Sequence, residues 1–248
     1  MEKIILYTRG DDCGISLSTN LAIFNACKYG ILKNISLIAN SPYIKNAYEI
    51  LKDLKDVSFG IHITLTCEWK NIKWGPILGK ERVPSIVDEN GFFYPDSKIL
   101  YEKKPSRKDM EREIEAQFEY LETLGFEIVY ADVHMGIGWI YNIEEYIKNL
   151  CRKKKILFVD NLYKKFPNFE FGFEGFLKTL ENLSNGEYLL ITHPTLKTSE
   201  MRLYSTFWED AGSIIRKRVF DTEILTDEKV KEIIERKNIK LKKFEKRG

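Results

Sequence analysis

Residues 57–65 read Val-Ser-Phe-Gly-Ile-His-Ile-Thr-Leu, and the strict alternation of this stretch decides the fold. Its apolar side chains, Val57, Phe59, Ile61, Ile63 and Leu65, fall on one side of an extended chain. The other side carries Ser58, Gly60, His62 and Thr64. Successive side chains of a β-strand point to opposite faces, so this stretch predicts a strand with one apolar face and a histidine on the other.

Short β-rich runs recur on both sides of this strand and alternate with helical segments. Further strands are expected at 3–8, 34–39, 127–134, 155–159 and 187–192. Helices are expected from a cap at Ser18 or Thr19 to Gly30, over about 43–54, from the start signal of Ser106 and Asp109 to Gly125, over 142–153 and 172–184, and from a cap at Thr226 to about Lys237. This alternation predicts βα units, a mainly parallel sheet and an α/β fold of the (β/α) barrel type.

Residues 66–105 interrupt the rhythm, since they contain several Trp, Gly and Pro residues and no sustained period. We expect this segment to be a long insertion that folds over one end of the barrel, because its aromatic side chains would be costly to leave in water. Packing in the core is the expected role of these aromatics, and stacking on sugar rings is the alternative: Trp69, Trp74, Phe92, Phe93 and Tyr94.

Composition and charge exclude several classes of function. The chain has 248 residues, and 39 Lys+Arg against 37 Asp+Glu give a net charge of +2, which argues against a dedicated nucleic-acid or membrane-surface binder. Neither G-x-G-x-x-G nor G-x-x-x-x-G-K-[ST] occurs, which disfavours an NAD or ATP enzyme. No signal peptide or long apolar run is evident, and the four scattered cysteines fit a reducing compartment, so we expect a cytoplasmic protein.

The three histidines of the sequence and one acidic pair follow predicted strands. Asp11 and Asp12 follow the first strand, His62 lies near the end of the third, His134 ends the fourth, and His193 follows the strand at 187–192. The carboxyl ends of the strands of a parallel barrel meet at one face, where active sites are built. Each residue alone could be structural, but their convergence predicts a divalent-metal site made of one carboxylate and two imidazoles.

Five segments at these positions resemble the YdjC-like carbohydrate deacetylases. Residues 9–16 (RGDDCGIS) are similar to the family's D-D-F-G-[LI]-[ST] signature, and residues 59–66 (FGIHITLT) are similar to its G-x-H-x-x-L-T segment. Residues 131–134 (ADVH), residues 192–194 (THP) and residues 218–226 (RVFDTEILT) resemble three later motifs. The matches occur in order along nearly the whole chain.

The resemblance implies a single distorted (β/α) barrel domain over residues 1–248 that removes acetyl groups from N-acetylated amino sugars or chitooligosaccharides. By position, Asp12, His62 and His134 would bind a divalent ion, Mg or Zn, and Asp11 would be the general base. His193 would assist the departing amine. A small-molecule sugar is thus the expected partner, without nucleic acid or membrane, and a homodimer is plausible.

The sequence departs from the family pattern at two positions. The family often has a second histidine two residues after the third ligand, where this chain has Gly136, and Cys13 replaces the usual Phe after the acidic pair. Two alternatives to the deacetylase therefore stay open. One is a non-haem iron oxygenase, which also uses two histidines and one carboxylate, and the other is a sugar-binding or regulatory relative without turnover.

Overall fold

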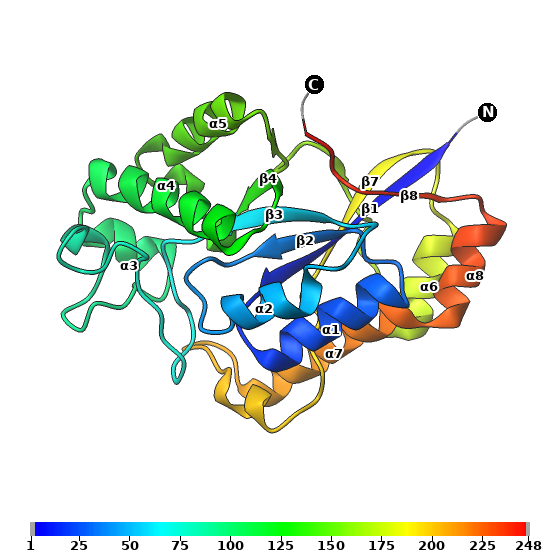
Figure 1. Ribbon diagram of the computed structural model, residues 1–248. Helices are drawn as coiled ribbons and strands as arrows, with labels where there is room; N and C mark the ends of the chain where they lie inside the picture. Colours follow the sequence, from blue (N-terminus) through cyan, green and yellow to red (C-terminus); the bar gives the residue numbers. More distant parts are fainter. Residues whose placement is uncertain (1–2, 247–248) are drawn as a thin grey trace.

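Parallel strands form the centre of the molecule. The structure, a computed structural model, describes residues 3–246, and within this range seven strands run side by side in the order β5-β4-β3-β2-β1-β7-β6. An eighth, β8, pairs in parallel with residues 5–7 of β1. The bounds are β1 Ile4–Cys13, β2 Asn34–Leu37, β3 Ser58–Ile63, β4 Ile128–Val133, β5 Leu157–Phe158, β6 Lys164–Lys165, β7 Gly186–Thr192 and β8 Lys240–Lys242. The sheet curves into a half-barrel (Figure 1), which confirms the expected distorted (β/α) barrel.

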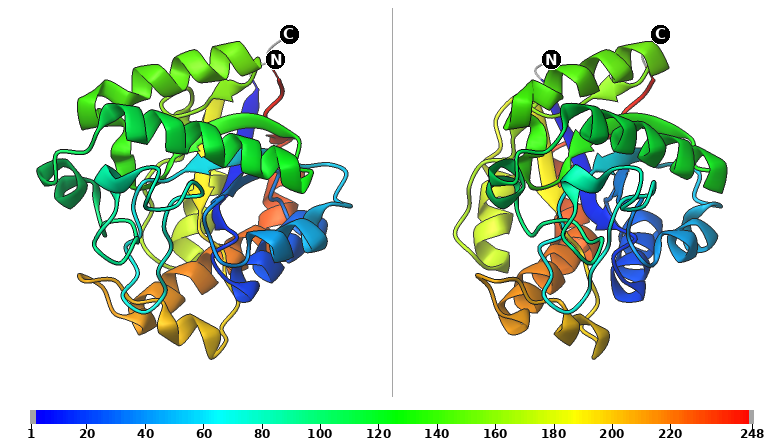
Figure 2. Two further views of the ribbon diagram at one scale, coloured as in Figure 1. Left: turned by 60° about the vertical axis from the view of Figure 1, so that its left-hand side comes forward. Right: turned by 90° about the vertical axis from the view of Figure 1, so that its left-hand side faces the viewer.

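Helices surround this sheet, as the three views show (Figures 1 and 2). Helix α4 packs on β3 and on α5, whereas α1 packs on α2 and α7, and α6 packs on α8. The α-helices are α1 Leu17–Lys28, α2 Ile44–Leu51, α3 Ser97–Glu102, α4 Arg107–Leu124, α5 Ile143–Lys154, α6 Phe173–Glu181, α7 Ala211–Thr226 and α8 Glu228–Arg236. Short 3-10 segments span Pro84–Ile86, His134–Asn142 and Glu200–Leu203.

The alternation of the strands separates an outer apolar layer from the barrel interior. Ile61 and Ile63 of β3 are fully buried in the large core beneath the helices. A smaller apolar cluster fills the part of the interior near the amino end of β1, and it includes Ile5, Tyr7, Tyr130, Leu189 and Phe244. The next side chains along the inward face of β1 are Arg9 and Asp11, so the interior changes from apolar to charged towards the carboxyl ends of the strands.

Two predicted helix caps were wrong. The cap of α1 is Ser16, whose extended backbone (φ −150°) lets its hydroxyl accept from the Thr19 amide at 2.9 Å, so Ser18 and Thr19 lie inside the helix. The Thr226 hydroxyl bonds to the Thr222 carbonyl within α7, and Asp227 caps α8 instead.

Helix α7 itself was not expected. Its apolar side chains are interrupted by charged ones, and one of these, Arg218, is buried because it reaches into the candidate site. A charged side chain on the buried face therefore weakens the apolar periodicity by which an amphipathic helix is recognised in a sequence.

The insertion at 66–105 folds onto the barrel as expected. Trp69, Trp74 and Phe93 are buried, which supports core packing for these three, while Phe92 is partly exposed. The segment is not wholly irregular, because Asp96 caps the short helix α3 with bonds to two backbone amides. Trp69 also forms an antiparallel bridge with Thr206, so the insertion is tied to the segment before α7.

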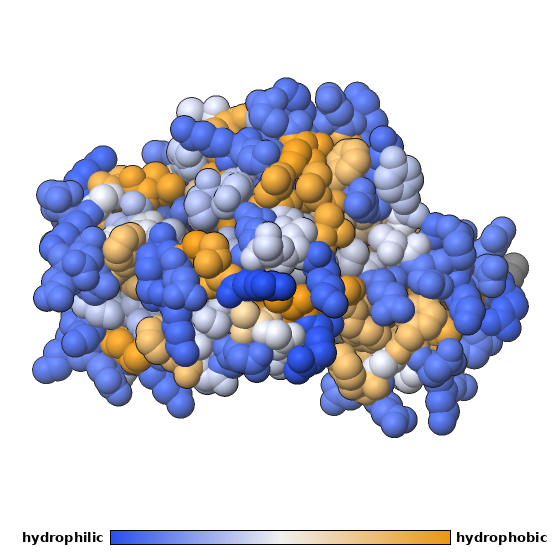
Figure 3. Space-filling model, turned by 90° about the horizontal axis from the view of Figure 1, so that it is seen from below, coloured by the Kyte–Doolittle hydropathy of each residue, from blue (hydrophilic) through white to orange (hydrophobic). Residues whose placement is uncertain are grey.

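The surface is mainly hydrophilic, with apolar groups gathered towards the middle of the face seen from below in Figure 1 (Figure 3). Several large aromatic side chains are more than half exposed: Tyr29, Trp139, Phe171, Phe207 and Trp208. None of the described helices is long and apolar enough to span a bilayer.

Candidate metal centre and active site

The carboxyl ends of three strands bring together Asp12, His62 and His134. Asp12 lies near the end of β1, His62 in β3, and His134 directly after β4. A regular strand would send Asp11 and Asp12 to opposite faces. The pairing of β1 with β2 shifts register between Gly10 and Cys13, and Asp12 has a left-handed backbone with φ 61°. This bulge turns both neighbouring carboxylates towards the same site.

The three side chains offer one ligand atom each. Asp12 Oδ1 lies 3.6 Å from His62 Nε2 and 3.4 Å from His134 Nδ1, and the two nitrogens are 3.1 Å apart. Two atoms that each lie about 2.1 Å from one ion, at angles between octahedral and tetrahedral, are about 3.0–3.4 Å apart. The Asp12 Oδ1 atom is buried and has no hydrogen-bond partner. Two of the three separations lie in this range and the third, to His62 Nε2, is slightly longer. The triangle is therefore close to the size that a divalent ion requires, and Oδ1 is an unused acceptor.

Buried charged groups support each of these side chains from behind. His62 Nδ1 lies 2.9 Å from Asp132 Oδ1, and His134 Nε2 lies 3.0 Å from Glu68 Oε2. Such carboxylates orient a ligating imidazole and fix its tautomer. Arg218 donates to the other oxygen of Asp12, which leaves Oδ1 directed at the two histidines.

The ion pairs set the charge state of the cluster. Burial alone would raise the pKa of Asp12, but Arg218 and His134 hold it well below the usual range. Burial alone would lower the pKa of His134, yet Glu68 and Asp12 raise it to about 10. The acids around His134 therefore favour a positive charge at this point, which a bound divalent ion could supply.

Asp11 is held on the other side of His62. Arg9 donates to both of its oxygens, from Nε at 2.7 Å and from Nη2 at 2.8 Å. Although burial opposes ionisation, Arg9 and His62 lower the pKa of Asp11, so this carboxyl group is ionised. Arg9 Nη1 also lies 2.6 Å from Asp132 Oδ2, so one guanidinium links the acid beside the site to the acid behind His62.

His193 faces the site from the end of β7. A cavity of about 210 Å³, here the active-site cavity, is lined by His193 and Asp221 together with Glu68 and Arg218, the partners of two candidate ligands. The His193 side chain is 42% exposed, and its Nδ1 lies 4.0 Å from Asp221 Oδ2. The carboxylate neighbour of His193 is thus Asp221, whose own pKa is raised by burial.

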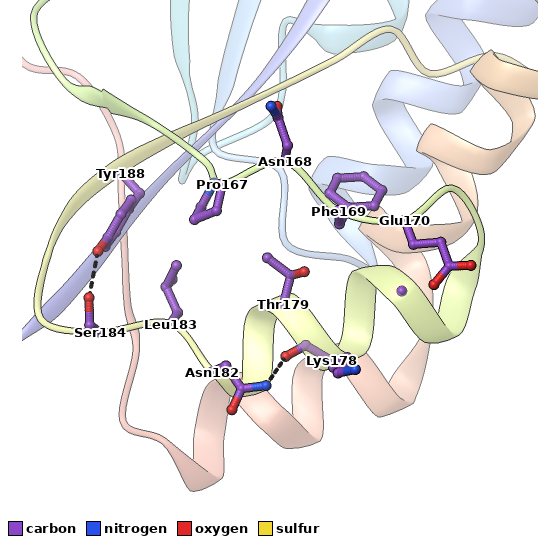
Figure 4. Close-up of a pocket in the computed structure, with 11 residues that line it drawn as sticks. Pro167, Asn168, Phe169, Glu170, Lys178, Thr179, Asn182, Leu183, Ser184 and Tyr188 are labelled. Carbon is purple, nitrogen blue, oxygen red and sulfur yellow. Dashed lines mark hydrogen bonds between the residues drawn. The ribbon is translucent and has the colours of Figure 1, made fainter.

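A larger hollow of about 390 Å³ lies elsewhere, between α6 and the segment at 167–170 (Figure 4). Two of its polar side chains are already bonded, since Ser184 bonds to Tyr188 and Asn182 bonds to the Lys178 carbonyl. No aspartate or histidine is among its lining residues. The chemistry of the described residues is therefore concentrated at the strand ends.

Three residues of this site were missed in the sequence. Arg9 precedes Asp11 by two positions and therefore lies on the same face of β1. The two-residue period of a strand could have predicted this contact. Glu68 lies in the insertion, where no pattern predicts orientation, and Arg218 lies on the unexpected helix α7.

Comparisons with known proteins identify the family of the chain. The family described as YdjC-like protein matches residues 5–163. A carbohydrate deacetylase of Thermoanaerobacter pseudethanolicus is 27% identical over 96% of this chain and 97% of its own length, and one of Enterococcus faecalis is 25% identical over 98% and 97%. A solved structure described as a putative cellobiose-phosphate cleavage protein from Enterococcus faecalis V583 has a TM-score of 0.77 at 23% identity, over 97% of both chains, and so shares the fold. With more than half of its length matched, the chain belongs to the YdjC-like protein family.

Proposed function

We propose that the protein is a metal-dependent carbohydrate deacetylase that hydrolyses the acetamide of an N-acetylated amino sugar or its oligomer. Relatives named carbohydrate deacetylase match nearly the full length of the chain, which supports the class of reaction. One observation supports metal binding most directly: Asp12 Oδ1 has no hydrogen-bond partner and faces two imidazole nitrogens at 3.4 and 3.6 Å.

Asp12, His62 and His134 would hold the ion, either Mg or Zn. Two nitrogens and one oxygen form a set that Zn accepts readily, whereas Mg prefers oxygen ligands and retains waters. When bound, the ion would lower the pKa of a coordinated water and polarise the acetamide carbonyl. The parallel barrel speaks against the oxygenase alternative, and the complete set of acids and imidazoles speaks against a relative without turnover.

Asp11 is proposed as the general base. Its lowered pKa keeps it ionised, and the two bonds from Arg9 fix its orientation while each oxygen retains a free lone pair. It would accept the proton of the attacking water as the new C–O bond forms.

His193 is proposed to donate a proton to the sugar nitrogen as the C–N bond breaks, which releases acetate and a free amine. The carboxylate that would pair with the imidazolium in this step is the half-buried Asp221, whose Oδ2 lies 4.0 Å from His193 Nδ1. The partial exposure of His193 at the active-site cavity would give it access to substrate. A cytoplasmic location and a homodimer remain predictions.

The test combines metal content with acetate release from N-acetylglucosamine and its oligomers. Chelator-treated protein should release no acetate, and re-addition of Zn or Mg separately should restore release and identify the better metal. Asp53, an exposed acid in the turn after α2, provides a control, because Asp53→Ala should retain both metal and activity. Release at an undiminished rate after verified metal removal would contradict the proposal.

A further inference from the structure

A cavity of about 390 Å³ opens on the side where the barrel does not close. β5 and β6 stand at the two ends of the strand order and are not paired with each other. The cavity lies along this seam, and its lining includes Asp160 and Asn161 after β5, Lys165 of β6 and Ile191 of β7. We call it the seam cavity.

The segment after His134 separates the seam cavity from the active-site cavity. Met135 lines the active-site cavity, whereas Gly136 and Gly138 line the seam cavity. A Cβ atom at Gly136 would meet nothing within 4 Å, so the space above this glycine is open. No side chain at position 136 therefore stands between the two cavities.

Trp139 provides a fixed aromatic surface in the seam cavity. Its side chain is exposed, but it is held in place. Its ring centroid lies 5.0 Å from that of Tyr101, and its Nε1 donates to Ser97 Oγ at 3.4 Å. An exposed indole that neighbouring groups hold still can stack on the apolar face of a sugar ring at little cost in conformational entropy.

Polar groups surround this ring. Asp160 is anchored by the Val133 amide at 3.0 Å, and Glu144 lies close to Gly138 at the start of α5. Carboxylates of this kind can accept hydrogen bonds from sugar hydroxyls. Arg9 also lines the cavity, but its Nη1 lies 2.6 Å from Asp132 Oδ2 and is occupied there.

We propose that the seam cavity is a carbohydrate subsite, which binds the sugar ring next to the acetylated one by stacking on Trp139 and by hydrogen bonds to Asp160. An aromatic platform with a few directed polar groups is what a ligand site of this chemistry needs. The assignment rests on the proposed function, because it places a neighbouring ring of the same substrate. The protein is therefore a binder of oligosaccharides rather than of single sugars.

The experiment compares binding of N-acetylglucosamine and its linear tetramer by calorimetry with Zn-loaded protein that carries Asp11→Asn to suppress turnover, and the variants below are made in this parent. The parent should bind the tetramer at least tenfold more tightly than the monomer. Trp139→Ala should lose most of this difference, since loss of one stacked ring is worth about a factor of ten. Trp139→Phe should restore part of it, because the stacking surface returns. Tyr29→Ala removes an equally exposed aromatic ring at the end of α1 and should change nothing.

Because Asp11→Asn suppresses turnover, the binding outcome is separate from that of the proposed function. Absence of acetate release by the Zn-loaded wild type, with a tetramer preference of the parent that depends on Trp139, would refute the deacetylase and support the subsite. Equal affinity of the parent for monomer and tetramer, or a Trp139→Ala protein that retains the full preference, would overturn the subsite.

Discussion

Glu68→Ala should weaken metal binding although Glu68 is not a proposed ligand. Its Oε2 lies 3.0 Å from His134 Nε2, and the carboxylate is 5% exposed. With Nε2 bonded to this acid, Nδ1 is the ring atom left to bind an ion that Asp12 Oδ1 and His62 Nε2 would share. Removal of the acid frees the ring to rotate or to take the other tautomer.

Loss of such an orienting carboxylate typically reduces metal affinity by about 10–100-fold, or about 1.4–2.7 kcal/mol. The assay is competition with a chromogenic chelator for Zn at constant pH, together with thermal unfolding of the metal-free protein. Glu68→Gln should lie between Ala and wild type, because its amide oxygen can still accept from Nε2 but carries no charge. Glu89→Ala, an exposed acid of the same insertion, is the matched control. A folded Glu68→Ala protein with wild-type Zn affinity would refute the reasoning.

Three further predictions follow from the same contacts. Asp11→Asn should retain its metal while acetate release falls by about 10²–10⁴-fold, the usual contribution of a positioned base; loss of the metal instead would make Asp11 a ligand. His193→Ala should retain fold and metal but lose most turnover, and a wild-type rate would exclude it as the acid. Burial raises the pKa of Glu113, although Asn40 and neighbouring donors oppose this. Above the ordinary pKa of about 4.3, Glu113 therefore binds more protons in the native state than in the unfolded chain. The free energy of unfolding, measured with urea, should therefore fall as pH rises from that value towards the raised one, and Glu113→Gln should flatten this slope; an unchanged slope would show that another group causes it.

The strands were the most predictable part of the fold, because their alternation follows from burial on one face. Residues 57–65 show this plainly, since β3 runs over Ser58–Ile63 and directs His62 inward. The helix α4 was also predicted closely, because Ser106 and Gly125 mark its two ends by local bonding. Such signals depend only on neighbours in the sequence.

Groups that depend on distant contacts could not be predicted. Arg218 is buried against Asp12 from a helix 206 positions later, and Glu68 meets His134 across 66 positions, so neither carries a local signal. The bulge at Asp12 also escapes a periodic pattern, although it is what lets Asp11 and Asp12 face one site. The acidic pair and the histidines could be proposed because they lie at the carboxyl ends of strands, although Asp11 and Asp12 lie within β1 and not after it as expected. Their supporting partners required the structure.

The central claim is that Asp12, His62 and His134 together hold one divalent ion. The most direct test is the metal content of purified protein by mass spectrometry after Zn loading and gel filtration, for the wild type, Asp12→Ala and the control Asp53→Ala. The account predicts one ion per chain in the wild type and in Asp53→Ala, and none in Asp12→Ala, since the unpartnered Oδ1 is lost. A folded Asp12→Ala protein that still carries one ion per chain would contradict it.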